Sequence, residues 1–489
     1  MRIIIIRKGQ VELFAVALCC AALAAAPATA ASLHTYTVRV DANFERLHVT
    51  AQFDAPVSNV AARSSSAESV LLDARDCDSN NTLAIRGRRL LVPEPGIECL
   101  QYAVDLQQAV RSEQRNESLH PDNVVVSPTV WMWRPRLGGD DEIEVRFLLP
   151  AGMQVSVPWE PIENSDYNYR LVASPQSGVA TSVFGRFHAQ LIKVGNSNLR
   201  VDILQATHEV NTSTIIDWLQ DTAHNIVRAY GRFPNPAARI VIFPVRRDRG
   251  DSPVGFGRVI RDGGETIELM IDPAQPMQAF YENWTATHEF SHLMLPYLQS
   301  EQRWISEGFA QYYQNVLLAR AGRYTQRYAW QKLFDGLERG RESAPGLSPN
   351  DAASGDERSS RMKIYWTGAA LALLADVELR HRSNGEQTLD DILGKFQQCC
   401  LPSRRTWSGV ELFSKFDSFL QEPLFMDLYH RYADTAGFPT VQPLLQELGV
   451  IHDGDNIGLS DDAELAQLRY TMTGRDPSIP EYDSAPRDR

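Results

Sequence analysis

Two histidines and a glutamate stand at a spacing that suits metal chemistry, in His288-Glu289-Phe290-Ser291-His292. In a helix, four residues rise about 6 Å, so both imidazoles lie on one face and can bind one ion. Zn²⁺ takes nitrogen and oxygen ligands at about 2 Å, and a catalytic zinc keeps one position open for water. Glu289 is rotated by about 100° from His288, so it can take a proton from that water without becoming a ligand. We predict that His288 and His292 bind Zn²⁺ and that Glu289 is the general base.

The alternative for this segment is an ordinary helix with packed or solvated histidines. Apolar residues surround the motif: Phe280, Trp284, Leu293 and Met294. A helix that buries them also carries the imidazoles toward the core, where polar groups without a partner are costly. A metal ion is the obvious partner. We expect one helix to carry Phe280, Trp284 and both histidines on one face, and Pro296 to end it.

A catalytic zinc needs a third protein ligand, and Glu307 is the candidate. Fourteen residues separate it from His292 (307 − 292 − 1), and it opens a helix predicted over 305–321. The loop after Pro296 can fold this helix back against the histidines. The alternative is a glutamate that only interacts favourably with the helix dipole. Because the three ligands form one set, we expect one zinc ion per chain.

These motifs resemble the gluzincin metallopeptidases. His-Glu-Phe-Ser-His at 288–292, followed by Trp-Ile-Ser-Glu-Gly-Phe-Ala-Gln-Tyr-Tyr at 304–313, is most similar to the glycyl aminopeptidase family and more distantly to aminopeptidase N. Tyr-Gly-Arg-Phe-Pro at 230–234, Tyr-Trp-Thr-Gly at 365–368 and Thr-Leu-Asp-Asp-Ile-Leu at 388–393 are also similar to that family. The resemblance covers about residues 199–450. The C-terminal PDZ module of the family is not expected in this chain.

The resemblance implies a zinc metallopeptidase, a hydrolase of peptide bonds. His288, His292 and Glu307 would bind zinc, and Glu289 would be the general base. Tyr365 matches the family's catalytic tyrosine, whose hydroxyl donates to the oxyanion of the tetrahedral intermediate. Without the resemblance, Tyr365 is simply a core aromatic residue.

The chain also departs from the family at the element that holds a substrate's free amine. It has no Gly-x-Met-Glu-Asn motif, although Glu265 and Glu268 stand in about the right place. The simpler interpretation makes them exposed residues of a strand over 265–271. We expect that strand to be the sheet edge along which a substrate pairs by β-augmentation. The resemblance therefore implies zinc chemistry but does not by itself imply aminopeptidase specificity.

Periodicity predicts an α+β chain with a thermolysin-like catalytic domain. Residues 31–195 contain alternating apolar and polar residues, which indicate a β-rich N-terminal domain. Residues 196–322 form the predicted catalytic domain and include a helix over 212–230. Residues 323–459 are predicted to form a helical C-terminal domain, with a loop over 343–360. We expect the acidic stretch 460–489 to be a disordered tail.

The N-terminus has the pattern of an export signal. Arg2, Arg7 and Lys8 precede an apolar stretch over 13–26, which is short for a membrane span. Ala28-Thr29-Ala30 supplies small residues for a signal peptidase, so we expect cleavage after Ala30. The mature protein would be periplasmic or secreted, without stable membrane insertion. The alternative is a retained N-terminal anchor.

Four cysteines follow the signal. Cys77 and Cys99 flank a predicted hairpin, and a disulfide between them suits an oxidising compartment. Cys399 and Cys400 are adjacent, and a bridge between neighbours is strained. We expect these two to be free or paired with another partner.

The formal net charge of −13 argues against a nucleic-acid partner, because binding phosphates requires a basic surface. The predicted partner is a peptide or protein substrate. Two alternatives remain: an inactive binding or scaffold protein that keeps the zinc fold, and a zinc hydrolase of a non-peptide substrate. The sequence leaves open the cleavage specificity, the endo- or exopeptidase mode and the oligomeric state.

Overall fold

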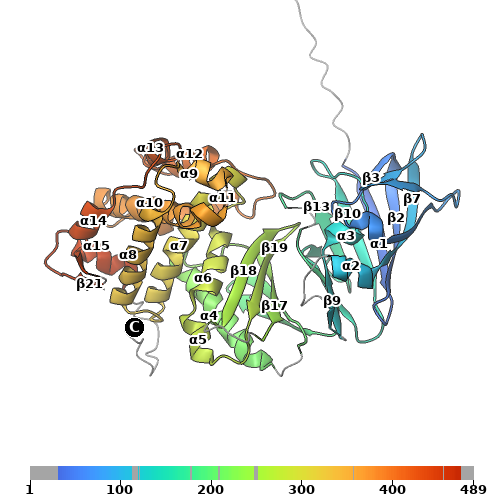
Figure 1. Ribbon diagram of the computed structural model, residues 1–489, viewed down its shortest axis with the longest axis horizontal. Coiled ribbons are helices and arrows are strands. Elements are labelled where there is room, and N and C mark those ends of the chain that lie inside the picture. Colours follow the sequence, from blue (N-terminus) through green and yellow to red (C-terminus); the bar gives the residue numbers. More distant parts are fainter. Residues whose placement is uncertain are drawn as a thin grey trace, which may run out of the picture. The chain divides into compact units, whose positions relative to one another are not determined.

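The computed structural model describes residues 31–112, 119–120, 122–176, 179–206, 210–246, 252–355, 357–454 and 456–474. The predicted signal over 1–30 lies outside these residues. Within the described ranges, no helix has both the length and the apolar character that a membrane crossing requires. Figure 1 shows that strands dominate the first part of the chain and helices the later part.

The described residues between 33 and 185 are rich in strands, as predicted. Every second residue of the first strand is buried, because one face of a pleated strand packs on the core. The elements of this region are β1 (Leu33–Val40), β2 (Arg46–Val57), β3 (Asn59–Ala61), α1 (Ala67–Val70), β4 (Leu71–Asp76), β5 (Ala84–Arg86), β6 (Arg89–Leu91), β7 (Ile97–Asp105), α2 (Leu106–Ser112), β8 (Leu119–His120), β9 (Asn123–Val126), α3 (Pro128–Trp131), β10 (Glu142–Leu148), β11 (Gln154–Ser156), β12 (Glu160–Pro161), β13 (Asn168–Val172) and β14 (Ser182–Gly185). They form sheets of order β12-β13-β10-β1-β2-β7-β4, β11-β14-β9-β8 and β3-β6-β5.

Both cysteine pairs form disulfides. Cys77 and Cys99, with Cα atoms 5.3 Å apart, close the segment that contains the β5–β6 hairpin. This pairing confirms the arrangement expected from the sequence. The expectation for Cys399 and Cys400 is wrong, because these neighbours are bridged to each other at the end of a helix.

The catalytic region is built on a five-stranded sheet of order β15-β16-β17-β19-β18. Its strands are β15 (His188–Val194), β16 (Ser197–Ile203), β17 (Ala237–Pro244), β18 (Val254–Arg261) and β19 (Glu265–Ile271). Since β15 pairs with β16, the sheet begins at His188, ahead of the boundary predicted at residue 196. The three strands β16, β17 and β19 are parallel, and β18 runs antiparallel to β19.

The prediction that residues 265–271 form the edge strand of the sheet is wrong. β19 pairs with β17 on one side and β18 on the other, so β18 is the edge strand. The polar residues of β19 misled the sequence interpretation. Glu265 and Glu268, which the simpler interpretation made exposed, are both buried.

Several helices and turns position the residues of the predicted metal site. Helix α4 (Thr212–Tyr230) has the predicted bounds, from the Asn211 cap to Gly231 in the left-handed conformation. The predicted single helix is instead three pieces: α5 (Met277–Glu282), α6 (Trp284–Ser291) and the 3-10 turn η1 (His292–Met294). It breaks at Asn283, whose backbone is extended and whose side chain accepts the Thr285 N–H. After η2 (Ser300–Gln302), helix α7 (Arg303–Arg320) begins close to the predicted residue.

The C-terminal region is mainly helical, as predicted. It contains α8 (Gln326–Glu342), α9 (Pro349–Ser354), α10 (Glu357–Arg382), α11 (Leu389–Cys400), α12 (Gly409–Asp417), α13 (Phe425–Tyr432), α14 (Gln442–Glu447), the hairpin β20 (Val450–Asp453) and β21 (Asn456–Leu459), and α15 (Ala466–Thr473). One hydrophobic core runs from the five-stranded sheet to Met472 in α15.

Two predictions in this region are wrong in part. The loop expected over 343–360 contains α9, because Ser348 caps a helix with Pro349 in its first turn. The tail expected from residue 460 contains α15, which buries Met472 against the core. Residues 475–489 lie outside the described ranges.

Candidate metal centre

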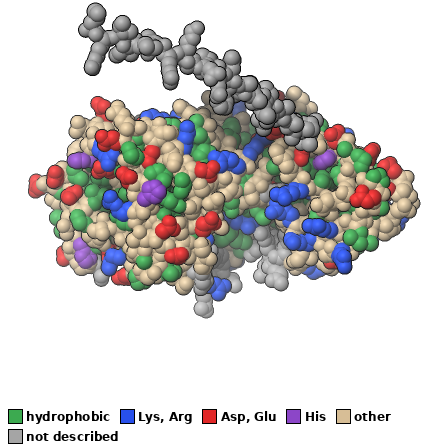
Figure 2. All heavy atoms as spheres, turned by 90° about the horizontal axis from the view of Figure 1, so that it is seen from above, with side chains coloured by type: hydrophobic (Ala, Val, Ile, Leu, Met, Phe, Trp, Pro, Cys, Tyr) green, Lys and Arg blue, Asp and Glu red, His purple; other side chains and the backbone are tan. Residues whose placement is uncertain are grey.

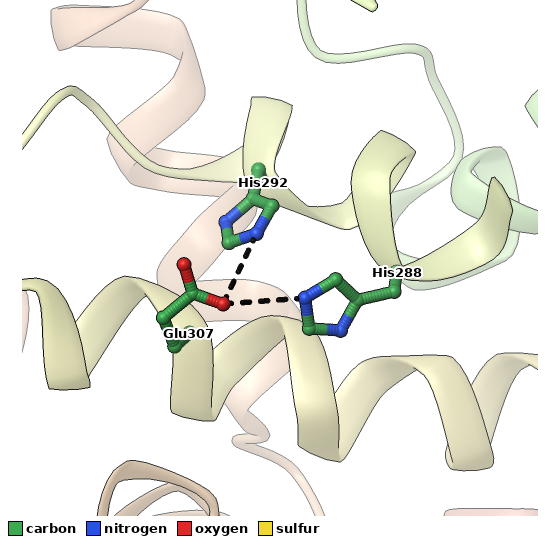
Figure 3. A group of neighbouring side chains, drawn as sticks. All are labelled: His288, His292 and Glu307. Atoms are coloured by element: carbon green, nitrogen blue, oxygen red, sulfur yellow. Dashed lines mark hydrogen bonds and ion pairs between the residues drawn. The ribbon is translucent and has the colours of Figure 1, made fainter. Parts of the chain in front are cut away.

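Three elements bring the predicted ligands together, as Figure 3 shows. His288 comes from α6, His292 begins η1, and Glu307 lies near the start of α7. Glu307 Oε2 lies 3.3 Å from His288 Nε2 and 3.6 Å from His292 Nε2. Two ligands of a tetrahedral zinc lie about 3.3–3.4 Å apart when each is about 2.0–2.1 Å from the metal. The donor set therefore fits Zn²⁺, and its role as a metal site stays a prediction.

In both histidine rings, Nδ1, the nitrogen that does not face Glu307, forms a hydrogen bond. His288 Nδ1 lies 2.9 Å from Gln314 Oε1, and His292 Nδ1 lies 3.0 Å from Ser306 Oγ. An amide oxygen can only accept, so His288 Nδ1 carries the proton and Nε2 faces Glu307. Burial lowers the pKa of His292 to about 3, which keeps this ring in the neutral form that binds metals.

The sequence interpretation missed these two partners. Gln314 stands two helical turns after Glu307 on the same face of α7, and Ser306 is adjacent to Glu307. Helical spacing from the third ligand was therefore the signal that pointed to Gln314.

Glu289 lies against the edge strand. A Cβ atom added to Gly257 of β18 would stand 2.5 Å from the Glu289 Cγ, so the glycine leaves room for the carboxylate. Glu289 is buried, and burial raises its pKa to about 7 while His288 acts in the opposite direction. A carboxylate with a pKa in this range is suited to take up and release a proton near neutral pH.

Tyr365 of α10 lies beside the ligands. Its ring stacks on the His288 imidazole, with centroids 5.9 Å apart and an angle of 13° between the planes. Burial tends to raise the pKa of Glu307, and the hydrogen bond from the Tyr365 hydroxyl acts in the opposite direction. The hydroxyl therefore stands where it can donate to an oxygen next to the ligand set.

Helices α7 and α10 cross at two glycines. A Cβ atom on Gly368 would stand 2.9 Å from the Gly308 Cα and would also overlap the Trp304 carbonyl oxygen. Gly308 directly follows Glu307, and Gly368 is three residues after Tyr365. This close crossing sets the distance between the third ligand and the tyrosine.

The two glutamates considered for amine binding are already paired. Glu268 accepts from Arg258 at 2.6 Å and from the Thr181 hydroxyl at 2.7 Å. Glu265 lies 3.2 Å from Arg261, which also donates to the His292 carbonyl oxygen. Both carboxylates are buried, so the structure does not support either as an available site for a substrate's amine.

Known proteins resemble this chain in sequence motif and in fold. Residues 296–367, which include Glu307 and Tyr365, match the model of the M61 glycyl aminopeptidase family. An aminopeptidase N family protein from Idiomarina loihiensis has a similar structure, with a TM-score of 0.64, 14% identity and coverage of 86% of this chain and 78% of that chain. An M1 zinc metallopeptidase from Deinococcus radiodurans aligns with a TM-score of 0.47 and 14% identity over 84% of this chain and 94% of that chain. Among curated proteins, the sequence has no significant match.

The structural likeness confirms the predicted fold class. The chain has mixed sheets and helices in the fold of the aminopeptidase N family protein, with a β-rich N-terminal domain and a helical C-terminal domain.

Proposed function

We propose that this chain, whose family match and fold support a gluzincin-type zinc metallopeptidase, hydrolyses peptide bonds with a zinc-activated water. The observation that carries the proposal is the convergence of His288, His292 and Glu307 within 4.8 Å of one another. Glu289 and Tyr365 flank this set, as the reaction requires.

Each residue has a role that follows from its position. Held by the three ligands, Zn²⁺ would polarise the scissile carbonyl and lower the pKa of water. Glu289 takes the proton from the attacking water and delivers it to the leaving amine. The Tyr365 hydroxyl donates to the oxyanion of the tetrahedral intermediate. A substrate strand pairs with β18, the edge strand, where Gly257 passes Glu289.

The substitution Glu289→Gln tests the mechanism. It removes the proton acceptor and keeps the shape, so the variant should bind zinc normally and lose at least about 10²-fold in kcat/KM. Metal analysis of both proteins should find about one zinc per chain, as one set of three ligands predicts. A fully active variant would show that Glu289 is not the base.

A peptide-library digest read by mass spectrometry separates the remaining possibilities. Internal cuts indicate an endopeptidase, and removal of single N-terminal residues indicates the aminopeptidase activity that the family match favours. If the zinc-loaded protein cuts no peptide, the alternatives of a scaffold protein or a hydrolase of another substrate gain. The position of Glu289 against Gly257 argues against a scaffold, which has no chemical need for a buried carboxylate.

Export is a separate proposal. Its support is the signal pattern over 1–30 and the Cys77–Cys99 disulfide, which suits an oxidising compartment. Mass spectrometry of the mature protein should find Ala31 as the first residue. A mature protein that begins at Met1 contradicts cleavage after Ala30 and favours the retained anchor.

A further inference from the structure

An arginine-lined cavity lies next to the turn that follows β18. It has a volume of about 670 Å³, and among the described residues Asp262 is the single acidic one in its lining. The basic residues that line it are Arg63, Arg88, Arg89, Arg134 and Arg136. In Figure 2, Lys and Arg side chains gather on the part at the right, where Figure 1 labels strands β2, β7 and β13.

The positive charge of this cavity is not balanced from within. Asp262 accepts the Ala180 N–H at 3.3 Å and interacts electrostatically with Arg134. The other four arginines have no carboxylate partner in the described part of the chain. Like charges gathered around one hollow repel each other and raise the local concentration of anions. The cluster is the more notable because the whole chain carries a net charge of −13.

The walls of the cavity suit an organic anion rather than an inorganic one. Met132, Leu137, Trp159 and Leu171 supply apolar surface beside the guanidinium groups. Sites for organic ligands have volumes of roughly 300–1,000 Å³, much more than one phosphate needs. Glutamate and aspartate side chains match this mixture, since arginine binds carboxylates with paired hydrogen bonds and the apolar walls cover their stems.

The cavity lies at the end of β18, the edge strand with which a substrate is proposed to pair. Arg261, the last residue of β18, donates its N–H to Gln176 Oε1 at 2.8 Å and accepts the Gln176 N–H at 3.2 Å. This pairing ends the open edge, and Ala173 and Ser174 of the same loop line the cavity. A peptide paired with β18 at Gly257 reaches Asp262 after five residues, or about 17 Å.

We propose that the arginine-lined cavity binds an acidic segment of the peptide substrate, several residues away from the scissile bond. The proposal rests on the proposed function because it names the substrate class of that same site.

The test compares two fluorescent peptides that differ only in a run of Glu or Gln residues. Binding is measured with the zinc-loaded, full-length Glu289→Gln protein, so that no cleavage occurs. We expect the Glu peptide to bind at least about tenfold more tightly at low salt, and added salt to weaken this preference.

The double substitution Arg88→Glu/Arg89→Glu should abolish the preference. The control Arg86→Glu/Arg146→Glu has the same charge change at exposed residues outside the cavity, and it should keep the preference.

The outcomes separate this proposal from the proposed function. Equal binding of both peptides overturns the cavity assignment, and so does an equal loss of preference in the control. Binding of inorganic phosphate without binding of the Glu peptide overturns it as well, because the site then serves a small anion. A protein that binds the Glu peptide through the cavity but cleaves nothing contradicts only the peptidase proposal.

Discussion

The two histidines of the site are oriented by uncharged side chains. Gln314 accepts from His288 Nδ1 at 2.9 Å, and this bond holds Nε2 toward the other ligands. We predict that Gln314→Leu lowers the zinc affinity by about 10–100-fold, as is usual when the partner of a ligating histidine is lost. Competition with a metal-binding dye measures the affinity directly.

Gln311→Leu is the matched control, on the same helix. Gln311 is also buried, and its side chain forms no hydrogen bond with the three ligands among the described residues. This variant should bind zinc like the wild type. If both variants lose affinity equally, the effect comes from packing of α7 and not from the hydrogen bond.

At the residue scale, the sequence predicts those site residues that lie within about one helical turn of each other. His288, Glu289 and His292 follow each other closely, so their chemistry is readable without tertiary structure. Glu307 followed from the need for a third ligand on a neighbouring helix, whereas Tyr365 came from the resemblance to a family. Gly257 escaped notice because its importance lies in a contact between a distant strand and Glu289.

At the scale of elements, the close crossing of α7 and α10 holds Glu307 near Tyr365. The substitution Gly368→Ala adds a methyl group where the Trp304 carbonyl oxygen and Gly308 leave no space. The helices must separate, and overpacking of this kind costs about 1–3 kcal/mol. Since Glu307 and Tyr365 move apart with the helices, we predict that kcat/KM falls by about 10²-fold. Thermal unfolding and peptide hydrolysis measure the two effects.

The control for this crossing is Gly346→Ala. A Cβ atom at Gly346 meets nothing within 4 Å, so the melting temperature and the activity should stay near the wild-type values. A Gly368→Ala protein with unchanged kinetics would show that the site tolerates a wider crossing.

The element predictions failed where a tertiary contact overrides a local pattern. Helix α4 has the predicted bounds because Asn211 and Gly231 mark both ends in the sequence. The helix predicted to carry the motif breaks at Asn283. This side chain caps α6 by accepting a backbone N–H, and the apolar pattern around it did not reveal this cap. The sequence predicted β19 at the edge of the sheet because the polar residue Glu268 suggested an exposed position. In the structure Glu268 is instead buried and pairs with Thr181 and Arg258.

At the scale of the whole molecule, Glu268 links the N-terminal domain to the catalytic sheet. It accepts from Thr181 of the loop before β14, and its carboxylate lies 2.6 Å from Arg258 and 4.0 Å from Arg239. Arg239 in turn donates to the Thr181 carbonyl oxygen at 2.8 Å. One carboxylate therefore compensates two basic side chains, and Arg239 is itself buried.

The substitution Glu268→Gln should destabilise the protein by about 3–5 kcal/mol at neutral pH, because it removes the carboxylate that contributes most to compensating the buried Arg239. Burial tends to raise the pKa of Glu268, but Arg258 and Arg239 lower it below the ordinary value of 4.5. A depressed native pKa stabilises the fold above the unfolded pKa, and this stability is lost as the pH falls through the native value. The difference in unfolding free energy between wild type and variant should thus be complete above about pH 5 and shrink in stronger acid. Urea unfolding at several pH values measures it, with the exposed Glu98→Gln as the control. A loss that does not change with pH would mean that the charge of Glu268 is not its cause.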